Sequence, residues 1–148
     1  MGDSPPRLRC AGSASRSRGF AKLHAVDEWE VRVTDELLGW ISELDSRSMT
    51  LVVDSIDRLA DAGPSLGRPL VDRLAGSKIH NIKELRPGSA GSSEIRIIFV
   101  FDPWRSAILL VGGDKSGDWS GWYREAIPRA EQLYVEYVKE WEAEEGKS

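Results

Sequence analysis

The stretch "EIRIIFVFDPWRSAILLVGGDK", residues 94–115, predicts two neighbouring strands joined by a tight turn. In its first part, apolar residues recur at every second position, the period of a strand that packs on a core: Ile95, Ile97, Phe99 and Phe101. "DPWRS" then supplies aspartate and proline at positions that these residues favour in turns. The next run, 106–112, is continuously apolar, which is typical of a central or covered strand.

Upstream of this stretch, residues 79–86 predict another strand, and a Gly/Ser-rich turn joins it to the strand 94–102. Nearer the N-terminus, the segment 27–33 alternates apolar and charged residues, which predicts a first strand with one solvent-facing side. Two helices are expected between these strands. Thr34 is placed to cap the first, and the second begins at Ser46 and ends at Gly63-Pro64.

The C-terminal part carries an apolar stripe at helical spacing, made of Leu133, Tyr134, Tyr137, Val138 and Trp141. Pro128 either starts this helix at its first position or kinks a helix that begins near Trp119. The predicted order is therefore β-α-α-β-β-β-α. This is an α+β fold in which two N-terminal helices and a C-terminal helix pack on an antiparallel C-terminal meander.

The 148 residues suit one domain with a single core. Residues 1–23 are rich in Ser, Arg and Gly and lack the apolar stretch of a signal peptide, so we expect a disordered extension before a domain spanning 24–146. No window approaches the roughly 18 apolar residues of a membrane span. Cys10 is the only cysteine, which excludes a disulfide framework or a thiolate metal site and fits a cytoplasmic protein.

The net charge of −4 conceals a segregated pattern. Residues 24–63 carry ten acids against three arginines, whereas residues 68–129 carry ten bases against seven acids. An acidic protein repels a polyanion at long range, but a local basic face can bind one within a Debye length of ~8–10 Å. The alternative is ordinary heterogeneity of the surface.

Two arginines stand close to the turn between the strands 79–86 and 94–102. Because neighbouring antiparallel strands carry them, Arg86 and Arg96 can project side by side from one face of the sheet. Like charges in that position cost stability unless an anion or a carboxylate lies between them. A phosphate is one such partner, and Glu84 and Glu94 offer the structural alternative of a salt-bridge ladder. The residue pattern alone leaves both open.

Four features together resemble the phage-derived HigB-like toxins of the RelE/ParE superfamily. They are "KELR" (83–86), "EIRIIF" (94–99), "ILLVGGDK" (108–115) and the C-terminal helix at Pro128. The resemblance covers residues 26–140, and the predicted element order agrees with it. The chain departs from the family pattern in the Gly/Trp-rich stretch after Lys115 and in its overall acidity.

The resemblance implies a RelE-like fold and the toxin half of a type II toxin–antitoxin pair. Such toxins act in the cytoplasm, enter the ribosome and cleave mRNA there. A helix-turn-helix antitoxin of the HigA/Xre type neutralises them, and contact with operator DNA occurs only through that antitoxin. No membrane, metal or cofactor is expected, and the sequence has no Cys/His metal cluster, GxSxG elbow or phosphate-cradling loop.

RNA cleavage without a metal requires an activated 2′-hydroxyl, a stabilised phosphorane and a protonated leaving oxygen. With the resemblance, Arg86, Arg96 and Lys115 are the expected catalytic residues, and arginine suits the phosphate because its planar fork stays charged. Lys115 also serves as a candidate acid or base; otherwise it is a solvated lysine at a strand end.

Further candidates surround these three. Stacking on bases and binding of phosphates predict RNA-binding roles for Lys83, Trp119, Tyr123 and Arg124. His80 and Asp114 are possible acid–base groups, with a surface histidine and a turn residue as the respective alternatives. Two other functions stay open: a non-catalytic family member that only binds its antitoxin, and a ParE-like poison of gyrase.

Overall fold

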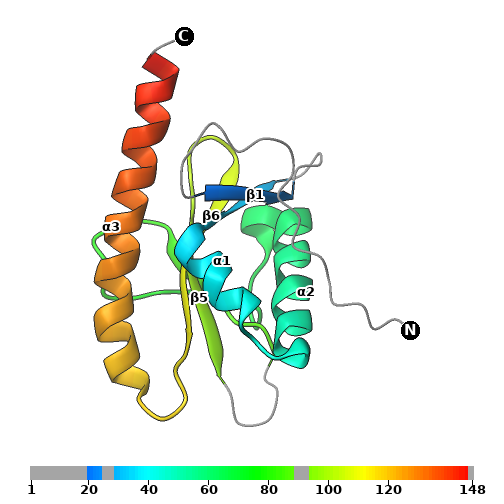
Figure 1. Cartoon of the computed structure of the whole chain (residues 1–148). Helices are drawn as coiled ribbons and strands as arrows, with labels where there is room; N and C mark the ends of the chain where they lie inside the picture. The colour runs from blue at the N-terminus through cyan, green and yellow to red at the C-terminus, as the bar shows by residue number, and fades with distance from the viewer. Residues whose placement is uncertain (1–19, 25–28, 89–93, 147–148) are drawn as a thin grey trace.

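The computed structural model of the chain (Figure 1) describes residues 20–24, 29–88 and 94–146. Its centre is a six-stranded sheet in the order β1-β2-β6-β5-β4-β3. The strands are β1 (Phe20–His24), β2 (Glu30–Thr34), β3 (Val71–Arg73), β4 (Ile82–Leu85), β5 (Ile95–Phe101) and β6 (Ser106–Asp114). β4, β5 and β6 form the predicted antiparallel meander, and β2 joins β6 in parallel.

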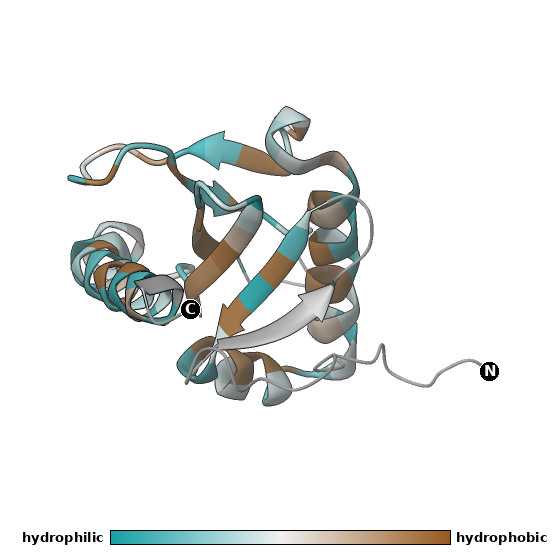
Figure 2. Cartoon of the chain, turned by 90° about the horizontal axis from the view of Figure 1, so that it is seen from above, coloured by the Kyte–Doolittle hydropathy of each residue, from teal (hydrophilic) through white to brown (hydrophobic). Residues whose placement is uncertain are grey.

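Alternation along β5 explains how the sheet separates two cores. Ile95, Ile97 and Phe99 face a cluster that includes the apolar residues of the two N-terminal helices. Ile98 and Val100 face the opposite side and pack with the C-terminal helix. The strand is therefore covered on both faces, and the view from above shows the sheet between α3 and α2 (Figure 2).

The two N-terminal helices begin and end where the sequence predicts. Thr34 caps α1 (Asp35–Ser42) by accepting a hydrogen bond from Leu37 N at 3.1 Å. The same hydroxyl donates to Leu110 O of β6 at 2.8 Å, which ties the helix start to the sheet. α2 (Ser46–Ala62) ends at Gly63, whose φ of 59° favours glycine.

The C-terminal helix α3 (Trp119–Gly146) runs along the other face of the sheet and extends past it (Figure 1). It begins at Trp119, and Pro128 lies inside it, so Pro128 is not its first residue. Its buried side is the predicted stripe extended towards the N-terminus, with Ala126 and Ala130 packed beside Leu133 and Tyr137.

Consecutive glycines near the end of β6 let both helical layers approach the sheet closely. A Cβ at Gly112 would meet Leu37 and Trp40 of the α1 side, and a Cβ at Gly113 would overlap the Trp122 indole of α3. The pair in "LLVGGDK" thus fixes how near the start of α3 lies to the strand end. Trp122 is half-buried and packs against the core beneath α3.

Three features differ from the sequence prediction. β1 and β3 add a strand at each edge of the sheet, and β1 occupies residues 20–24, so the predicted disorder of 1–23 is wrong for 20–23; residues 1–19 lie outside the described residues. The predicted strand 79–86 begins only at Ile82, because Asn81 has a φ of 67° and forms a turn.

A buried carboxylate fixes α3 to the β5–β6 turn. Asp102 Oδ1 accepts hydrogen bonds from Trp104 N at 2.9 Å and Ser106 N at 2.8 Å, and Oδ2 accepts from the Tyr137 hydroxyl at 2.7 Å. Burial raises the pKa of Asp102, although these donors and the charge of Arg32 oppose the rise. The three hydrogen bonds that Asp102 accepts hold the turn in shape and fasten α3 to it, so this carboxylate has a structural role.

Candidate active site at one end of the sheet

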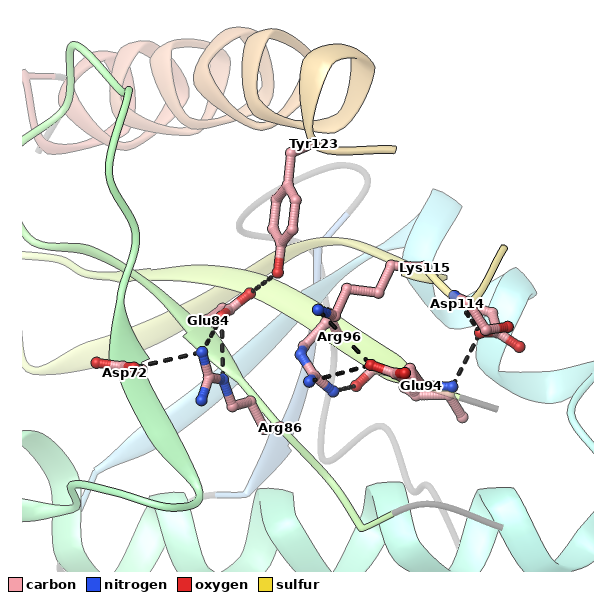
Figure 3. A network of polar contacts seen from close by, with 10 residues as sticks. Asp72, Glu84, Arg86, Glu94, Arg96, Asp114, Lys115 and Tyr123 are labelled. Atoms are coloured by element: carbon pink, nitrogen blue, oxygen red, sulfur yellow. Dashed lines mark hydrogen bonds and ion pairs between the residues drawn. The ribbon is translucent and has the colours of Figure 1, made fainter. Parts of the chain in front are cut away.

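The strand register brings the three expected catalytic residues to the same end of the sheet, beneath the start of α3 (Figure 3). Arg86 directly follows β4, Arg96 lies in β5 opposite Gly113, and Lys115 directly follows β6. Leu85 pairs with Ile97, so the next step of the ladder sets Arg86 across from Arg96. The proximity predicted from the hairpin is thus explained by the register.

Arg86 is held by two carboxylates. Its Nε and Nη2 donate to Glu84 Oε2 at 3.0 and 2.8 Å, and Nη2 lies 3.3 Å from Asp72 Oδ2 of β3. Burial lowers its affinity for the proton, but Glu84 and Asp72 outweigh it and raise the pKa of Arg86 above the ordinary value. The guanidinium is one third exposed, so one side of it remains accessible.

Arg96 and Lys115 share a second carboxylate. Glu94 Oε1 lies 3.7 Å from Arg96 Nη2 and 3.6 Å from Lys115 Nζ. Both cations are largely buried, whereas about half of the Glu94 side chain is exposed. Arg96 Nη1 also donates to Ile95 O at 2.9 Å, and its Nε is buried without a hydrogen-bond partner among the described residues.

Tyr123 of α3 links the two groups. Its hydroxyl donates to Glu84 Oε1 at 2.6 Å, and Lys115 Nζ lies 5.7 Å from the centre of its ring. Burial, and then the hydrogen bond to Glu84 and its charge, raise the pKa of Tyr123 well above its ordinary value. Tyr123 therefore stays protonated at neutral pH and can give a proton rather than take one.

Glu84 and Asp72 matter more here than the sequence indicated. Glu84 is almost fully buried and its two oxygens orient Tyr123 and Arg86 at the same time. Sequence reasoning considered it only as a neutralising charge. Asp72 was not considered, because β3 is three residues long and lies in a Gly/Pro-rich connector with no strand pattern.

Asp114 is an exposed turn residue. Its Oδ1 accepts hydrogen bonds from Glu94 N, Ser116 N and Ser116 Oγ at 2.9, 3.0 and 2.6 Å. Burial acts in the other direction, but these hydrogen bonds lower the pKa of Asp114 below its ordinary value. The carboxylate thereby fixes the turn that carries Glu94 and Lys115, which agrees with the turn alternative.

The remaining candidates are not brought into this group. Lys83 shares the strand face of Leu85, opposite to that of Glu84, and His80 is exposed in the loop before β4. Both line a separate cavity of about 270 Å³ with Arg73. Arg124 is exposed one residue beyond Tyr123. The side chain of Trp119 lies outside the described residues.

The cluster of Asp72, Glu84, Arg86, Glu94, Arg96, Lys115 and Tyr123, here called the cationic cluster, contains three cations and three carboxylates. Each cation already touches a carboxylate, so the salt-bridge ladder expected as the structural alternative is present. Arg86 nevertheless remains one third exposed, and the buried Nε of Arg96 has no hydrogen-bond partner among the described residues. Within the part of the chain that the structure describes, no three His, Cys, Asp or Glu side chains are grouped to hold a metal, and no helix is long and apolar enough to cross a membrane.

Comparison with known proteins adds the family. The model of the phage-derived protein Gp49-like family (DUF891) matches residues 39–135, a range that holds the whole cationic cluster. "Putative toxin HigB2" of Mycobacterium tuberculosis is 45% identical over 108 residues, which cover 73% of this chain and 54% of that protein. "Putative toxin HigB3" of the same organism is 54% identical over 93 residues, 63% of this chain and 79% of that protein. The chain thus spans about half of the first relative and most of the second, and it belongs to the phage-derived Gp49-like family of HigB-like toxins.

Proposed function

We propose that the protein is the toxin of a type II toxin–antitoxin pair and cleaves mRNA on the ribosome without a metal. The observation that carries the proposal is the convergence of Arg86, Arg96, Lys115 and Tyr123 at one end of the sheet. The names of its relatives support the toxin role, and its partner is then a helix-turn-helix antitoxin.

In the proposed reaction, the 2′-hydroxyl oxygen attacks the adjacent phosphorus, and the bond from phosphorus to the 5′-oxygen breaks. The products are a 2′,3′-cyclic phosphate and a free 5′-hydroxyl. The negative charge of the phosphorane builds up where Arg96 and Arg86 have their donors, and fixed cations in a largely buried site stabilise it well. These arginines replace their carboxylate contacts in part by contacts to phosphate oxygens.

Tyr123 is the proposed general acid. Its hydroxyl is protonated at neutral pH, and its proton passes to the departing 5′-oxygen, because an alkoxide is more basic than a phenolate. Glu84 is a positioning residue that holds this hydroxyl and the Arg86 guanidinium. The proton of the 2′-hydroxyl goes to the Glu94 carboxylate, which lies 3.6 Å from the Lys115 ammonium. A pH profile of cleavage by Glu94→Gln tests this step: loss of the acidic limb identifies Glu94 as the base.

The test is induced expression of the wild type and of Arg96→Ala, followed by mapping of mRNA 5′ ends. Arg58→Ala is the matched control, because Arg58 is an exposed arginine of α2 paired only with Asp54 at 3.2 Å. We expect new ends in translated transcripts with the wild type and the control, and their loss by ~10²–10³-fold with Arg96→Ala. Growth arrest with DNA breaks and intact mRNA identifies a gyrase poison instead. A wild type that leaves transcripts whole while still binding the antitoxin identifies a non-catalytic member.

A further inference from the structure

A cavity of about 420 Å³ lies beside the cationic cluster, between the segment before β4 and α3. It is called the α3 pocket here and is lined by Lys78, Tyr123, Arg124, Ile127, Pro128 and Glu131. Tyr123 belongs to both places: its ring borders the α3 pocket while its hydroxyl binds Glu84. Only the Tyr123 side chain therefore separates the cationic cluster from the α3 pocket, so one RNA strand can occupy both.

The wall of the pocket opposite α3 is fixed by Glu131. Its Oε2 accepts hydrogen bonds from Ser77 Oγ at 2.7 Å and Lys78 N at 2.8 Å. The backbone bond from Lys78, followed by that from Ser77, lowers the pKa of Glu131, so it is ionised at neutral pH. The carboxylate thus ties the loop that carries Lys78 to α3.

Two cations line the α3 pocket from different elements. Lys78 stands on the loop wall and Arg124 on the helix wall, and both are exposed. Among the described residues, neither has a carboxylate within ion-pair distance, in contrast to Arg86, Arg96 and Lys115. A phosphate between these cations does not first have to displace a carboxylate at ion-pair distance, and the one carboxylate among the described lining residues, Glu131, interacts with Lys78 through its charge and is held by the loop backbone.

The floor of the pocket suits the rest of a nucleotide. Ile127, Pro128 and the Tyr123 ring supply an apolar surface for a base or a sugar. Pro128 has no N–H, so the carbonyl of Arg124 lacks the donor that a helix normally supplies from four residues on. A ribose hydroxyl or an exocyclic amine can donate to such a carbonyl.

We propose that the α3 pocket binds the nucleotide that neighbours the cleaved bond, with its phosphate between Lys78 and Arg124. The inference rests on the proposed RNA-cleaving function and adds a binding subsite to it, in which Lys78 is a residue that the sequence did not single out. The subsite strengthens RNA binding and takes no part in breaking the bond.

The test compares two double charge reversals of equal net charge in the purified full-length chain. Lys78→Glu/Arg124→Glu changes the pocket, and Arg47→Glu/Arg58→Glu changes two exposed arginines of α2. Binding of a fluorescent single-stranded RNA hexanucleotide is measured by anisotropy at several salt concentrations. We expect the pocket variant to bind at least about tenfold more weakly and to lose about 0.7 from the salt slope, the value for one lost phosphate contact on a single strand. The control should stay within about twofold, and thermal unfolding monitors the fold of both.

Amide NMR shifts on adding the hexanucleotide provide an independent measurement, with shifts expected at Ile127 and at Gly76, which also lines the pocket. Equal loss of binding in both double variants, or shifts confined to the cationic cluster, would overturn the pocket. So would unchanged RNA binding by a pocket variant that no longer forms a complex with the antitoxin, because the pocket would then be a protein-docking surface.

Failure of the pocket and failure of the RNase proposal have different signatures. If the wild type cuts mRNA and the pocket variant cuts the same sites with the same efficiency, the proposed pocket subsite is rejected and the proposed RNase function stands. Hexanucleotide shifts at the pocket, beside a wild type that leaves translated mRNA whole, support the pocket as an RNA site and remove the cleavage reaction.

Discussion

The α3 helix carries two tyrosines that donate to buried carboxylates at opposite ends of the sheet. Tyr123 binds Glu84 at 2.6 Å, and Tyr137 binds Asp102 at 2.7 Å. Both carboxylates are nearly inaccessible to solvent, and burial raises the pKa of both tyrosines. Judged by this bond alone, the two pairs are equivalent.

Their surroundings differ. The second oxygen of Asp102 accepts hydrogen bonds from two backbone N–H groups of its own turn. These groups are neutral, and their hydrogen bonds to Asp102 use the one proton that each can donate. The second oxygen of Glu84 binds Arg86, an accessible cation close to Arg96 and Lys115. What decides between an anchor and a site is therefore the rest of the carboxylate's hydrogen bonds. Around Asp102 the other donors are neutral backbone groups, which do not attract an anion. Around Glu84 the other donor is the partly exposed Arg86 cation, which can bind one.

The largest expected difference comes from removing the two hydroxyls. Tyr123→Phe should lower mRNA cleavage by ~10²–10⁴-fold, because the proposed general acid is lost. Tyr137→Phe should leave cleavage per folded molecule unchanged. Each variant leaves a buried carboxylate short of one donor and should lose about 1–3 kcal/mol of unfolding free energy. Urea unfolding and primer extension measure the two effects. Equal loss of cleavage in both variants would mean that the pairs do not differ in function.

The carboxylates themselves give the next contrast. Glu84→Gln keeps the shape but removes the charge that holds Arg86, so we expect cleavage to fall by about 10- to 100-fold through misplaced groups. Asp102→Asn keeps acceptors for the turn and should not alter cleavage per folded molecule. Rates on the same translated transcript compare the two, and a fall with Asp102→Asn alone would reverse the assignment.

The two glycines of β6 separate the faces of the sheet. Gly113→Ala pushes against Trp122 and thus against the start of α3, whereas Gly112→Ala pushes against Leu37 and Trp40. Both should cost about 1–3 kcal/mol of stability through overpacking. Only Gly113→Ala should also reduce cleavage per folded molecule, because Tyr123 follows Trp122. Thermal unfolding and cleavage assays check this, and equal cleavage by both variants contradicts it.

The smallest expected effect concerns Asp102 and Asp114, which lie at opposite ends of the sheet. Their contributions to the unfolding free energy should change in opposite directions as the pH falls. The folded-state pKa of Asp102 is raised above the ordinary 3.8, so its contribution to stability is full below that value and is lost as pH rises through the folded pKa. The pKa of Asp114 is lowered, so its contribution is present above 3.8 and is lost as pH falls through the folded pKa.

Unfolding free energies between pH 2 and 7 test the signs. Relative to Asp102→Asn, the wild type should lose stability as pH rises through this range. Relative to Asp114→Asn, it should lose stability as pH falls. Parallel curves for the wild type and either variant would show that the carboxylate in question has no shifted pKa.

Much of the fold could be predicted from regular patterns. The period of two in β5 and the helical stripes of α1, α2 and α3 depend on the spacing of nearby residues, so they can be recognised in the sequence. β1 and β3 could not be found in this way, because short edge strands bury few side chains and leave little pattern. Asp72 was missed for the same reason.

The candidate site was partly predictable. Arg86 and Arg96 follow from the hairpin, since strand register turns their sequence positions into neighbours. The RNA-binding role predicted for Lys83 conflicts with the alternation of side chains in "KELR", because this alternation sets Lys83 on the face opposite Glu84 and Arg86. The bond between Tyr123 and Glu84 spans 39 residues and depends on how α3 packs, which no local spacing encodes.

The place of β6 in the sheet also sets an order of assembly during synthesis. β6 lies between β2 and β5, so the N-terminal strands have no neighbour on that side until residues 106–114 exist. Chains fold from the N-terminus as they emerge, and contacts of high sequence separation form late. Arg86 and Arg96 are made first, and the cationic cluster is complete only after Lys115 and the α3 helix that carries Tyr123 have followed. The candidate site therefore forms later than the strands that carry its two arginines.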